Sequence, residues 1–368
     1  MKKILLIGEV YSENLGDPLI CDMVGTILSD HFSDCEIIPL DLSGRASMEG
    51  FLPPPKNESV IRRLNRLNLR RTPASRAYNL DFERHIRVKA RLNDLLMQNR
   101  FDLAVFAGGA LFMDFFAGII HMICRRLKQA GVPVVFHASG MGGLTADSEA
   151  LLKSVFHMDN VISVSLRDSY NRFQATFGVP FVRTYDSALL CSQRYEPTAQ
   201  KRTQVGVGII DTPALQESLR DVLKHLDRFG IGWLLFTNGA QNDFAVGEKL
   251  LRDMKIDADS HLLPRPQTVS QLVRDITSFD CIVSCRLHSQ IIASSFGIVN
   301  HGIVWNEKVA DFHGLMGSNR RCHAIQNDLG FLNHLDRTYD SSLHQRAIEA
   351  GEHSKTVLLE ATERYLKP

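Results

Sequence analysis

The hydrophobic positions of the chain form two series, each made of short apolar runs separated by helical patterns. In the first series the predicted strands are residues 3–8, 36–40, 103–107, 132–137 and 161–164, and the predicted helices lie near 82–99, 115–130 and 147–157. Short apolar runs between turn residues are typical of buried strands. Their alternation with helices predicts βαβ units around a parallel sheet.

A second series follows a polar stretch at residues 191–203. Its predicted strands are residues 205–210, 233–237, 281–284 and 298–304, with helices between them and a long closing helix near 341–366. We therefore expect an α/β protein with two Rossmann-like domains whose parallel sheets face a cleft. Ligands of such sheets bind beyond the carboxyl ends of the strands.

The expected division is an N-terminal domain over 1–190, a C-terminal domain over 204–325 and a helical segment over 326–368. In the first predicted helix, Asp17 is the expected N-cap and Pro18 the first helical residue.

Residues 45–81 depart from the alternation as a basic insertion. From 56 to 100 there are twelve Lys or Arg against four Asp or Glu. This excess predicts peripheral contact of 56–100 with an anionic membrane surface, or attraction of a diphosphate-bearing acceptor. The alternative is a solvated helical segment whose arginine stems cover apolar surface.

Composition limits the function classes. With 368 residues and 44% apolar content the chain can bury a sizeable core in two domains. Its net charge of +1 gives no global field that points to nucleic acid. The apolar run before Glu9 is too short for a signal peptide, so we expect a cytoplasmic protein. Seven scattered cysteines support neither a disulfide framework nor a zinc site, and we expect reduced, mostly buried thiols.

The stretch DCIVSCRLHSQIIASSFG (280–297) places Arg286 and His288 where a predicted strand ends and a helix begins. The positive end of a helix dipole disfavours cations. A bound anion would explain both residues, because first-turn N–H groups and a guanidinium suit carboxylate or phosphate. A structural ion pair is the alternative.

Glycines and a second arginine follow strands of the first series. There is no GxGxxG after the first strand and no Walker A sequence. Gly108 and Gly109 instead allow close approach of a ligand to the backbone, with a plain turn as the alternative. Arg167 follows another strand, with Asp168 as the expected helix N-cap, and is either an anion ligand or half of a structural ion pair.

Six stretches in order resemble motifs of the polysaccharide pyruvyl transferase family, over roughly residues 1–315. They are NLGDPLI (14–20), GGALFMD (108–114), SLRDS (165–169), YDSALL (185–190), SCRLHSQIIASSFGI (284–298) and NEKV (306–309). The resemblance implies a two-domain GT-B-like fold. It also implies transfer of pyruvate from phosphoenolpyruvate onto two hydroxyls of a sugar as a ketal.

Carried over by position, Arg286 and His288 match the family's Arg-Leu-His motif for donor binding and catalysis. Arg167 matches an arginine that implies a second contact to the donor anion. Lys308 and Asp186 match further motif positions. In the first motif, Asn14 is a substrate-binding candidate, as are the paired glycines at 108–109.

Ketal formation requires a proton on the methylene carbon of the donor. His288 is the expected acid, since histidine titrates near neutral pH. Asp17 is the expected acceptor of a hydroxyl proton, with helix capping as its alternative role. Arginine can neutralise the donor charge, so we expect no metal and no cofactor. The expected partners are phosphoenolpyruvate and a sugar or lipid-linked oligosaccharide acceptor, without nucleic acid.

Two other functions compete with this hypothesis. A GT-B glycosyltransferase would use a nucleotide sugar and need a carboxylate for the ribose hydroxyls, for which Asp243 or Glu307 are the available residues. A catalytically silent sugar-binding protein is the other alternative. Such a protein would not need Arg167, Arg286, His288 and Lys308 together.

Overall fold

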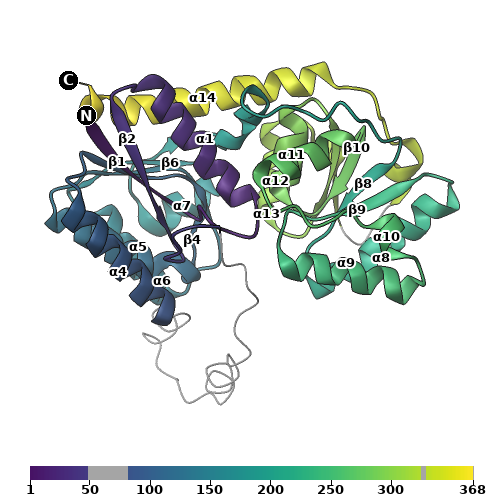
Figure 1. Ribbon diagram of the computed structural model, residues 1–368, viewed down its shortest axis with the longest axis horizontal. Helices are drawn as coiled ribbons and strands as arrows, with labels where there is room; N and C mark the ends of the chain where they lie inside the picture. The colour runs from purple at the N-terminus through teal and green to yellow at the C-terminus, as the bar shows by residue number, and fades with distance from the viewer. Residues whose placement is uncertain (49–81, 325–328, 368) are drawn as a thin grey trace, which may run out of the picture. The chain divides into compact units, whose positions relative to one another are not determined.

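The computed structural model describes residues 1–48, 82–324 and 329–367 (Figure 1). The chain divides into two compact units, each built around its own parallel sheet. Unit 1 comprises Met1–Ser12, Val24–Thr184 and Thr356–Pro368, and unit 2 comprises Glu13–Met23 and Tyr185–Lys355.

This division departs from the uninterrupted blocks expected from the sequence. Residues 13–23 and 185–190 group with unit 2. Helix α1 (Gly16–His31) begins in unit 2 and ends in unit 1, and helix α14 (Ser341–Leu366) contributes residues to both units. Because single helices run from one unit into the other, no composition change in the sequence marks these boundaries.

Unit 1 contains a seven-stranded sheet in the order β2-β1-β3-β5-β6-β7, with β4 paired to β5. The strands are β1 (Lys2–Gly8), β2 (Cys35–Asp41), β3 (Leu103–Phe106), β4 (Gly109–Phe112), β5 (Val134–Met141), β6 (Val161–Leu166) and β7 (Val182–Arg183). All pairs are parallel. The strand order reverses between β1 and β3, which is where ligands bind in open α/β sheets.

Four helices contribute to the main core of unit 1. They are α4 (Phe82–Gln98), α5 (Asp114–Gln129), α6 (Ala146–Phe156) and α7 (Tyr170–Phe177). Phenylalanines dominate this core: the rings of Phe106 and Phe136 stack at 4.4 Å, and Phe112 packs edge-on against Phe136 at 5.4 Å. Each buried ring contributes on the order of 2–3 kcal/mol. This core holds the strand ends of unit 1 in place.

Unit 2 contains a five-stranded parallel sheet in the order β12-β11-β10-β8-β9. The strands are β8 (Val205–Gly208), β9 (Trp233–Phe236), β10 (Cys281–Ser284), β11 (Val299–Val304) and β12 (Cys322–Ala324). The first four are buried along nearly their whole length, as expected for parallel strands covered on both faces. The strand order reverses between β8 and β10.

The sheet of unit 2 is connected by helices. These are η2 (Ser187–Gln193), α8 (Pro213–Arg228), α9 (Gln241–Met254), α10 (Ala258–His261), α11 (Val269–Ser278), α12 (Leu287–Ser295), α13 (Glu307–Leu315), η3 (Asn319–Arg321) and η4 (Leu329–His334). Apolar side chains of α8 and α9 share one buried cluster with alternate residues of β8 and β9. The other face of β10 carries α12, whose first turn reaches the carboxyl edge of the sheet.

The predicted strands of both series and the long helix at 341–366 are confirmed, with ends that differ by a few residues. Two predicted caps are wrong. Helix α1 begins at Gly16, so Asp17 lies in its first turn. The N-cap of α7 is Ser169 rather than Asp168. The short strands β4, β7 and β12 were not predicted, because their two to four residues carry no readable period.

Most of the predicted basic insertion, and most of the range predicted to contact a membrane, lie outside the residues that the structure describes. Residues 49–81 lie outside the described residues, and of the range 56–100 the structure describes α4 and the residues after it. Within residues 1–48, 82–324 and 329–367, every helix is too short or too polar to cross a bilayer.

The cysteines agree with the prediction of reduced thiols. All seven lie in the described residues and are free, and five of them are buried. Burial raises the pKa of Cys191 and Cys281 to about 12. These thiols are therefore protonated and act as small apolar side chains.

Buried histidines predict a loss of stability in acid. Burial lowers the pKa of His137 on β5 to about 3, and burial together with His323 and Arg321 lowers the pKa of His301 on β11 to about 3. For both histidines the folded pKa lies below the unfolded value. The contribution of each neutral, buried ring to the free energy of unfolding is therefore complete above about pH 6.5 and is lost as the pH falls toward 3. Each ring should contribute about 1.4 kcal/mol per pH unit.

Urea unfolding between about pH 7.5 and 5 measures this slope. His137→Gln should show a shallower pH dependence of the unfolding free energy than the unaltered protein. Equal slopes for the two proteins would contradict the assignment to His137.

Candidate functional site

The candidate site lies at the carboxyl edge of the unit 2 sheet, where the strand order reverses between β8 and β10. Four segments leave the sheet at this edge: 209–211 after β8, 237–239 after β9, 285–286 after β10 and 305–306 after β11. The indole Nε1 of Trp305 donates to the carbonyl of Cys285 at 2.8 Å. This hydrogen bond ties the ends of two neighbouring strands together.

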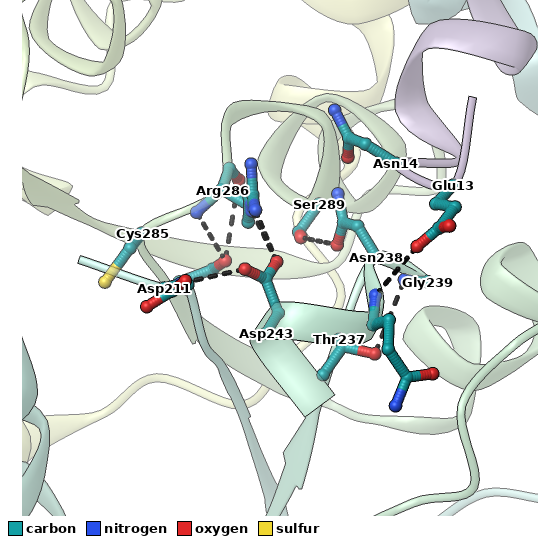
Figure 2. A network of polar contacts seen from close by, with 12 residues as sticks. Glu13, Asn14, Asp211, Thr237, Asn238, Gly239, Asp243, Cys285, Arg286 and Ser289 are labelled. Carbon is teal, nitrogen blue, oxygen red and sulfur yellow. Dashed lines mark hydrogen bonds and ion pairs between the residues drawn. The ribbon is translucent and has the colours of Figure 1, made fainter. Parts of the chain in front are cut away.

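Arg286 is paired with a buried carboxylate (Figure 2). Its Nε donates to Oδ2 of Asp243 at 2.9 Å, and its Nη2 contacts the same oxygen. The other oxygen of Asp243 accepts from the backbone N–H of Asp211 at 2.8 Å. Asp243 is 1% exposed, whereas the Arg286 side chain is 22% exposed. Burial raises the pKa of Asp243, and the charge of Arg286 opposes this shift.

The ion pair with Asp243 explains how a cation is tolerated at the N-terminus of a helix. Arg286 is the N-cap residue of α12, and its own backbone N–H donates to Ser284 Oγ at 3.0 Å. The counter-charge comes from Asp243 in the first turn of α9, so the position of Arg286 does not by itself require a bound anion. The structural ion pair considered as the alternative is present.

His288 lies one residue into α12 and is 7% exposed. Its Nε2 is 3.7 Å from Oδ2 of Asp186, and Oδ1 of Asp186 accepts from the backbone N–H of Ala188 at 2.9 Å. The carboxylate of Asp186 can therefore balance the positive charge of a protonated His288 ring while remaining anchored at the start of η2.

The loop at residues 13–16 lies against this edge of unit 2. The backbone N–H of Leu15 donates to the carbonyl of Asn238 at 2.8 Å, and Glu13 Oε2 accepts from the backbone N–H of Gln241 at 3.1 Å. Gly239 has a φ of +102°, and a Cβ there would lie 2.5 Å from the carbonyl oxygen of Glu13. The loop therefore depends on glycine at 239.

Gly16 contacts the His288 ring directly. A Cβ at Gly16 would lie 2.2 Å from Nδ1 of His288, which is closer than real side chains allow. The start of α1 thus supports one face of this ring. The loop also brings two predicted residues to unit 2, since Nδ2 of Asn14 donates to Oδ2 of Asp17 at 2.8 Å.

Three asparagines at this edge keep a buried polar atom that has no hydrogen-bond partner among the described residues. These atoms are Oδ1 of Asn14, Nδ2 of Asn238 and Oδ1 of Asn306. The amide orientation of Asn14 is set by Asp17, because a carboxylate only accepts. Asn238 is fully buried and accepts from Ser289 Oγ at 2.6 Å (Figure 2). Buried unfilled atoms of this kind call for a ligand or water group.

The sequence-predicted site residues divide between the units. Asn14, Asp17, Arg286, His288 and Lys308 belong to unit 2. Lys308 is half-buried in the first turn of α13. Asn238, Ser289 and Asn306 were not predicted as site residues from the sequence. The one sequence signal that Asn238 and Asn306 carry is position, because each lies two residues after the end of a buried strand.

Arg167 and the glycine pair belong to unit 1. Arg167 follows β6, is 6% exposed and has its Nε 3.6 Å from Oδ2 of Asp168. The backbone N–H of Met141 donates to Oδ1 of Asp168 at 3.0 Å. Gly108 and Gly109 have φ values of +108° and +90° after β3, at the reversal of strand order in unit 1. Their positive φ requires glycine.

The family is decided by sequence. Residues 14–307, most of the chain, match the family described as "Polysaccharide pyruvyl transferase". The chain belongs to the polysaccharide pyruvyl transferase family. The resemblance found in the six motifs is thereby confirmed. A search of curated proteins gives no match to this chain.

Solved structures place this pyruvyl transferase family member in the GT-B fold. A putative UDP-N-acetylglucosamine 2-epimerase from Listeria monocytogenes is similar with a TM-score of 0.59 and 11% identity, over 100% of this chain and 97% of that chain. A UDP-glucosyltransferase from Polygonum tinctorium has a TM-score of 0.56 and 11% identity, over 100% and 99%. UDP-GlcNAc 2-epimerase from Neisseria meningitidis has a TM-score of 0.53 and 12% identity, over 99% and 100%. The predicted GT-B-like fold with two Rossmann-like domains is confirmed.

The contact between Gly16 and His288 gives a test that is independent of activity. Gly16→Ala should lower the free energy of unfolding by about 1–3 kcal/mol, because the new methyl group must displace the buried ring. Gly25→Ala on the same helix is the matched control, since its Cβ would lie 3.5 Å from Leu6 Cδ2 in ordinary contact. The helix propensity of alanine should make that control neutral or stabilising.

Chemical denaturation of both variants measures the difference, and the histidine ring signals in NMR report the displacement of His288. Equal stability of the two variants would mean that Gly16 does not pack on the ring.

Proposed function

We propose that this protein transfers pyruvate from phosphoenolpyruvate onto two hydroxyls of a sugar in a polysaccharide or its precursor, as a ketal. The observation that carries the proposal is the pairing of an anchored guanidinium, Arg286, with a carboxylate-backed imidazole, His288, at the reversal of strand order in unit 2. Family membership supports a transferase of pyruvyl groups.

The donor is recognised by charge. Phosphoenolpyruvate carries a carboxylate and a phosphate, and near neutral pH it offers mainly hydrogen-bond acceptors. The partly exposed guanidinium of Arg286, the ammonium of Lys308 and the first turn of α12 supply donors and positive charge. Asp243 holds the Arg286 fork in one orientation, which reduces the entropy lost when the anion binds.

The acceptor is recognised by neutral groups. The unfilled Oδ1 atoms of Asn14 and Asn306 can only accept hydrogen bonds, so they cannot bind ionised carboxylate or phosphate oxygens. A sugar hydroxyl supplies the O–H that they lack. We therefore assign the asparagines of this edge to the acceptor and the cations to the donor.

The reaction proceeds in two additions. His288 donates a proton to the methylene carbon of the donor, which leaves an oxocarbenium-like centre at the adjacent carbon, and one sugar hydroxyl attacks it. The second hydroxyl then takes the place of the phosphate, which leaves with the C–O bond electrons, and the proton of this hydroxyl returns to the neutral ring of His288. Asp186 balances the charge of protonated His288. Asp17, beside Asn14, takes a proton from the attacking hydroxyl.

Three residues of unit 1 are also predicted to bind substrate. Arg167 stays a predicted contact to the donor anion, and Gly108 and Gly109 stay predicted substrate-binding residues. The acceptor sugar, lipid-linked or free, is bound as an uncharged polyol.

The nucleotide-sugar alternative has less support. It needs a carboxylate for the ribose hydroxyls, but Asp243 is used by Arg286 and by the backbone of Asp211. Glu307 is exposed in the first turn of α13. Neither residue presents a buried, available carboxylate.

A substitution of His288 tests the proposed reaction. His288→Gln should keep the thermal stabilisation by phosphoenolpyruvate but lower phosphate release with an acceptor by about 10²- to 10⁴-fold, because the amide cannot deliver the proton. The exposed His334 of the same unit provides the control variant His334→Gln, which should keep full activity. Phosphate release by His288→Gln within tenfold of the unaltered protein would remove His288 as the acid. Stabilisation by UDP-sugars instead of phosphoenolpyruvate would favour the glycosyltransferase.

The division between donor and acceptor groups is tested by two variants that control for each other. Arg286→Lys should raise the KM for phosphoenolpyruvate roughly 10- to 100-fold and leave the acceptor KM nearly unchanged, because lysine cannot reproduce the fork. Asn14→Ala should raise the acceptor KM roughly 10-fold and leave the KM for phosphoenolpyruvate nearly unchanged. Steady-state kinetics with each substrate varied in turn measures both effects, and parallel changes in the two KM values would contradict the division.

A further inference from the structure

A basic groove lies between α4 and α5 of unit 1. It encloses about 260 Å³ and lies away from the strand ends discussed above. The lining residues are His85 and Lys89 from α4 and His121, Met122, Arg125, Arg126 and Gln129 from α5. The two helices run close together on the same side of the unit 1 sheet in Figure 1.

The groove concentrates positive charge without a carboxylate in its lining. Among the described residues, Lys89, Arg125 and Arg126 form no ion pair. Elsewhere on α5 the cation Lys128 does have a partner, Asp159 at 3.0 Å. Because the whole chain carries a net charge of only +1, the excess at the groove is local.

The two histidines of the groove respond to this field. Burial and then Lys89 lower the pKa of His85, and burial and then Arg125 lower the pKa of His121. Neighbouring cations repel a further proton, so the groove is an environment that favours an anion.

The outer side of α4 adds exposed apolar side chains beside the cations. Ile86 is 48% exposed and Met97 is 78% exposed. They lie on the stripe opposite the buried residues Val88, Leu92 and Leu95. A helix that presents cations and large apolar side chains to the same side has the composition of interfacial membrane helices.

We propose that this α4–α5 surface, formed by Ile86, Lys89, Met97, Arg125 and Arg126, docks on an anionic phospholipid bilayer. The three cations contact lipid phosphates, and the two apolar side chains enter the boundary between headgroups and acyl chains. A soluble phosphate compound would use the cations but would leave Ile86 and Met97 in water, so the bilayer accounts for both features. The proposal is independent of the donor chemistry in unit 2.

Co-sedimentation with vesicles tests the proposal. The full chain should bind phosphatidylcholine vesicles that contain phosphatidylglycerol and should not bind phosphatidylcholine alone, and high salt should weaken the binding. Replacing Lys89, Arg125 and Arg126 together by Gln should lower the vesicle affinity roughly 100-fold, at about fivefold for each cation.

A matched triple variant separates the surface from net charge. Lys224, Arg228 and Arg252 are exposed in unit 2, and their replacement by Gln changes the net charge equally. This control should bind vesicles like the unaltered protein, and thermal unfolding should show that both triple variants are folded. Ile86→Ser with Met97→Ser should also weaken binding, mainly the part that persists in high salt.

Three outcomes would overturn the proposal. These are equal losses in the two triple variants, absence of binding to the anionic vesicles, and loss of vesicle binding on addition of millimolar inorganic phosphate at constant ionic strength. Loss of vesicle binding on addition of phosphate would show that the groove binds a small anion instead of a bilayer. Phosphate release with a soluble acceptor should be unchanged in the groove variant, so a failure of the proposed reaction and a failure of docking are observed separately.

Discussion

The ion pair between Arg286 and Asp243 is the interaction on which the candidate site depends. A buried carboxylate is costly unless it is paired and hydrogen-bonded, and Asp243 meets this condition through Arg286 and the backbone of Asp211. The same contact joins the ends of β8 and β10 through α9. Removing either partner would leave a buried or half-buried charge uncompensated. The guanidinium is therefore held in one orientation at the end of β10, next to the place where the strand order reverses.

His288 shows the same principle with different partners. Its ring is held between the carboxylate of Asp186 and the backbone at Gly16, two contacts from distant parts of the chain. The loop at 13–16 is in turn held by Glu13 and by the absence of a side chain at Gly239. The proposed role as general acid requires that the ring be fixed relative to the reacting carbon, and these two contacts restrict its position.

The polar groups at the edge of unit 2 are of two chemical types. Arg286 and Lys308 are charged donors, and Asn14, Asn238 and Asn306 are neutral amides. Under the proposed function, the charged donors bind the strongly charged substrate and the amides bind the uncharged one. The α4–α5 surface adds a third kind of contact, in which cations and apolar side chains occur together.

Much of the fold could be read from sequence. The period of the apolar runs predicted both sheets and their helices, because buried parallel strands need a local apolar pattern regardless of their neighbours. Arg286 and His288 were predicted as site residues for a different reason, since a cation and an imidazole between a strand and a helix are conspicuous. The ends of α1 and α7 were misplaced, because capping depends on backbone geometry that residue preference alone does not determine.

The sequence by itself determined the two α/β units, the family motifs and the residue types available for anion binding. Only the tertiary structure decided which of them meet. Asp243 lies 43 residues before Arg286, and Asn14 lies far from Asn238 in the chain. They come together because the order β12-β11-β10-β8-β9 puts the ends of β8, β9 and β10 at one edge and the loop at 13–16 lies against it. Strand order and loop contacts are set by packing between distant segments, and no local pattern encodes them.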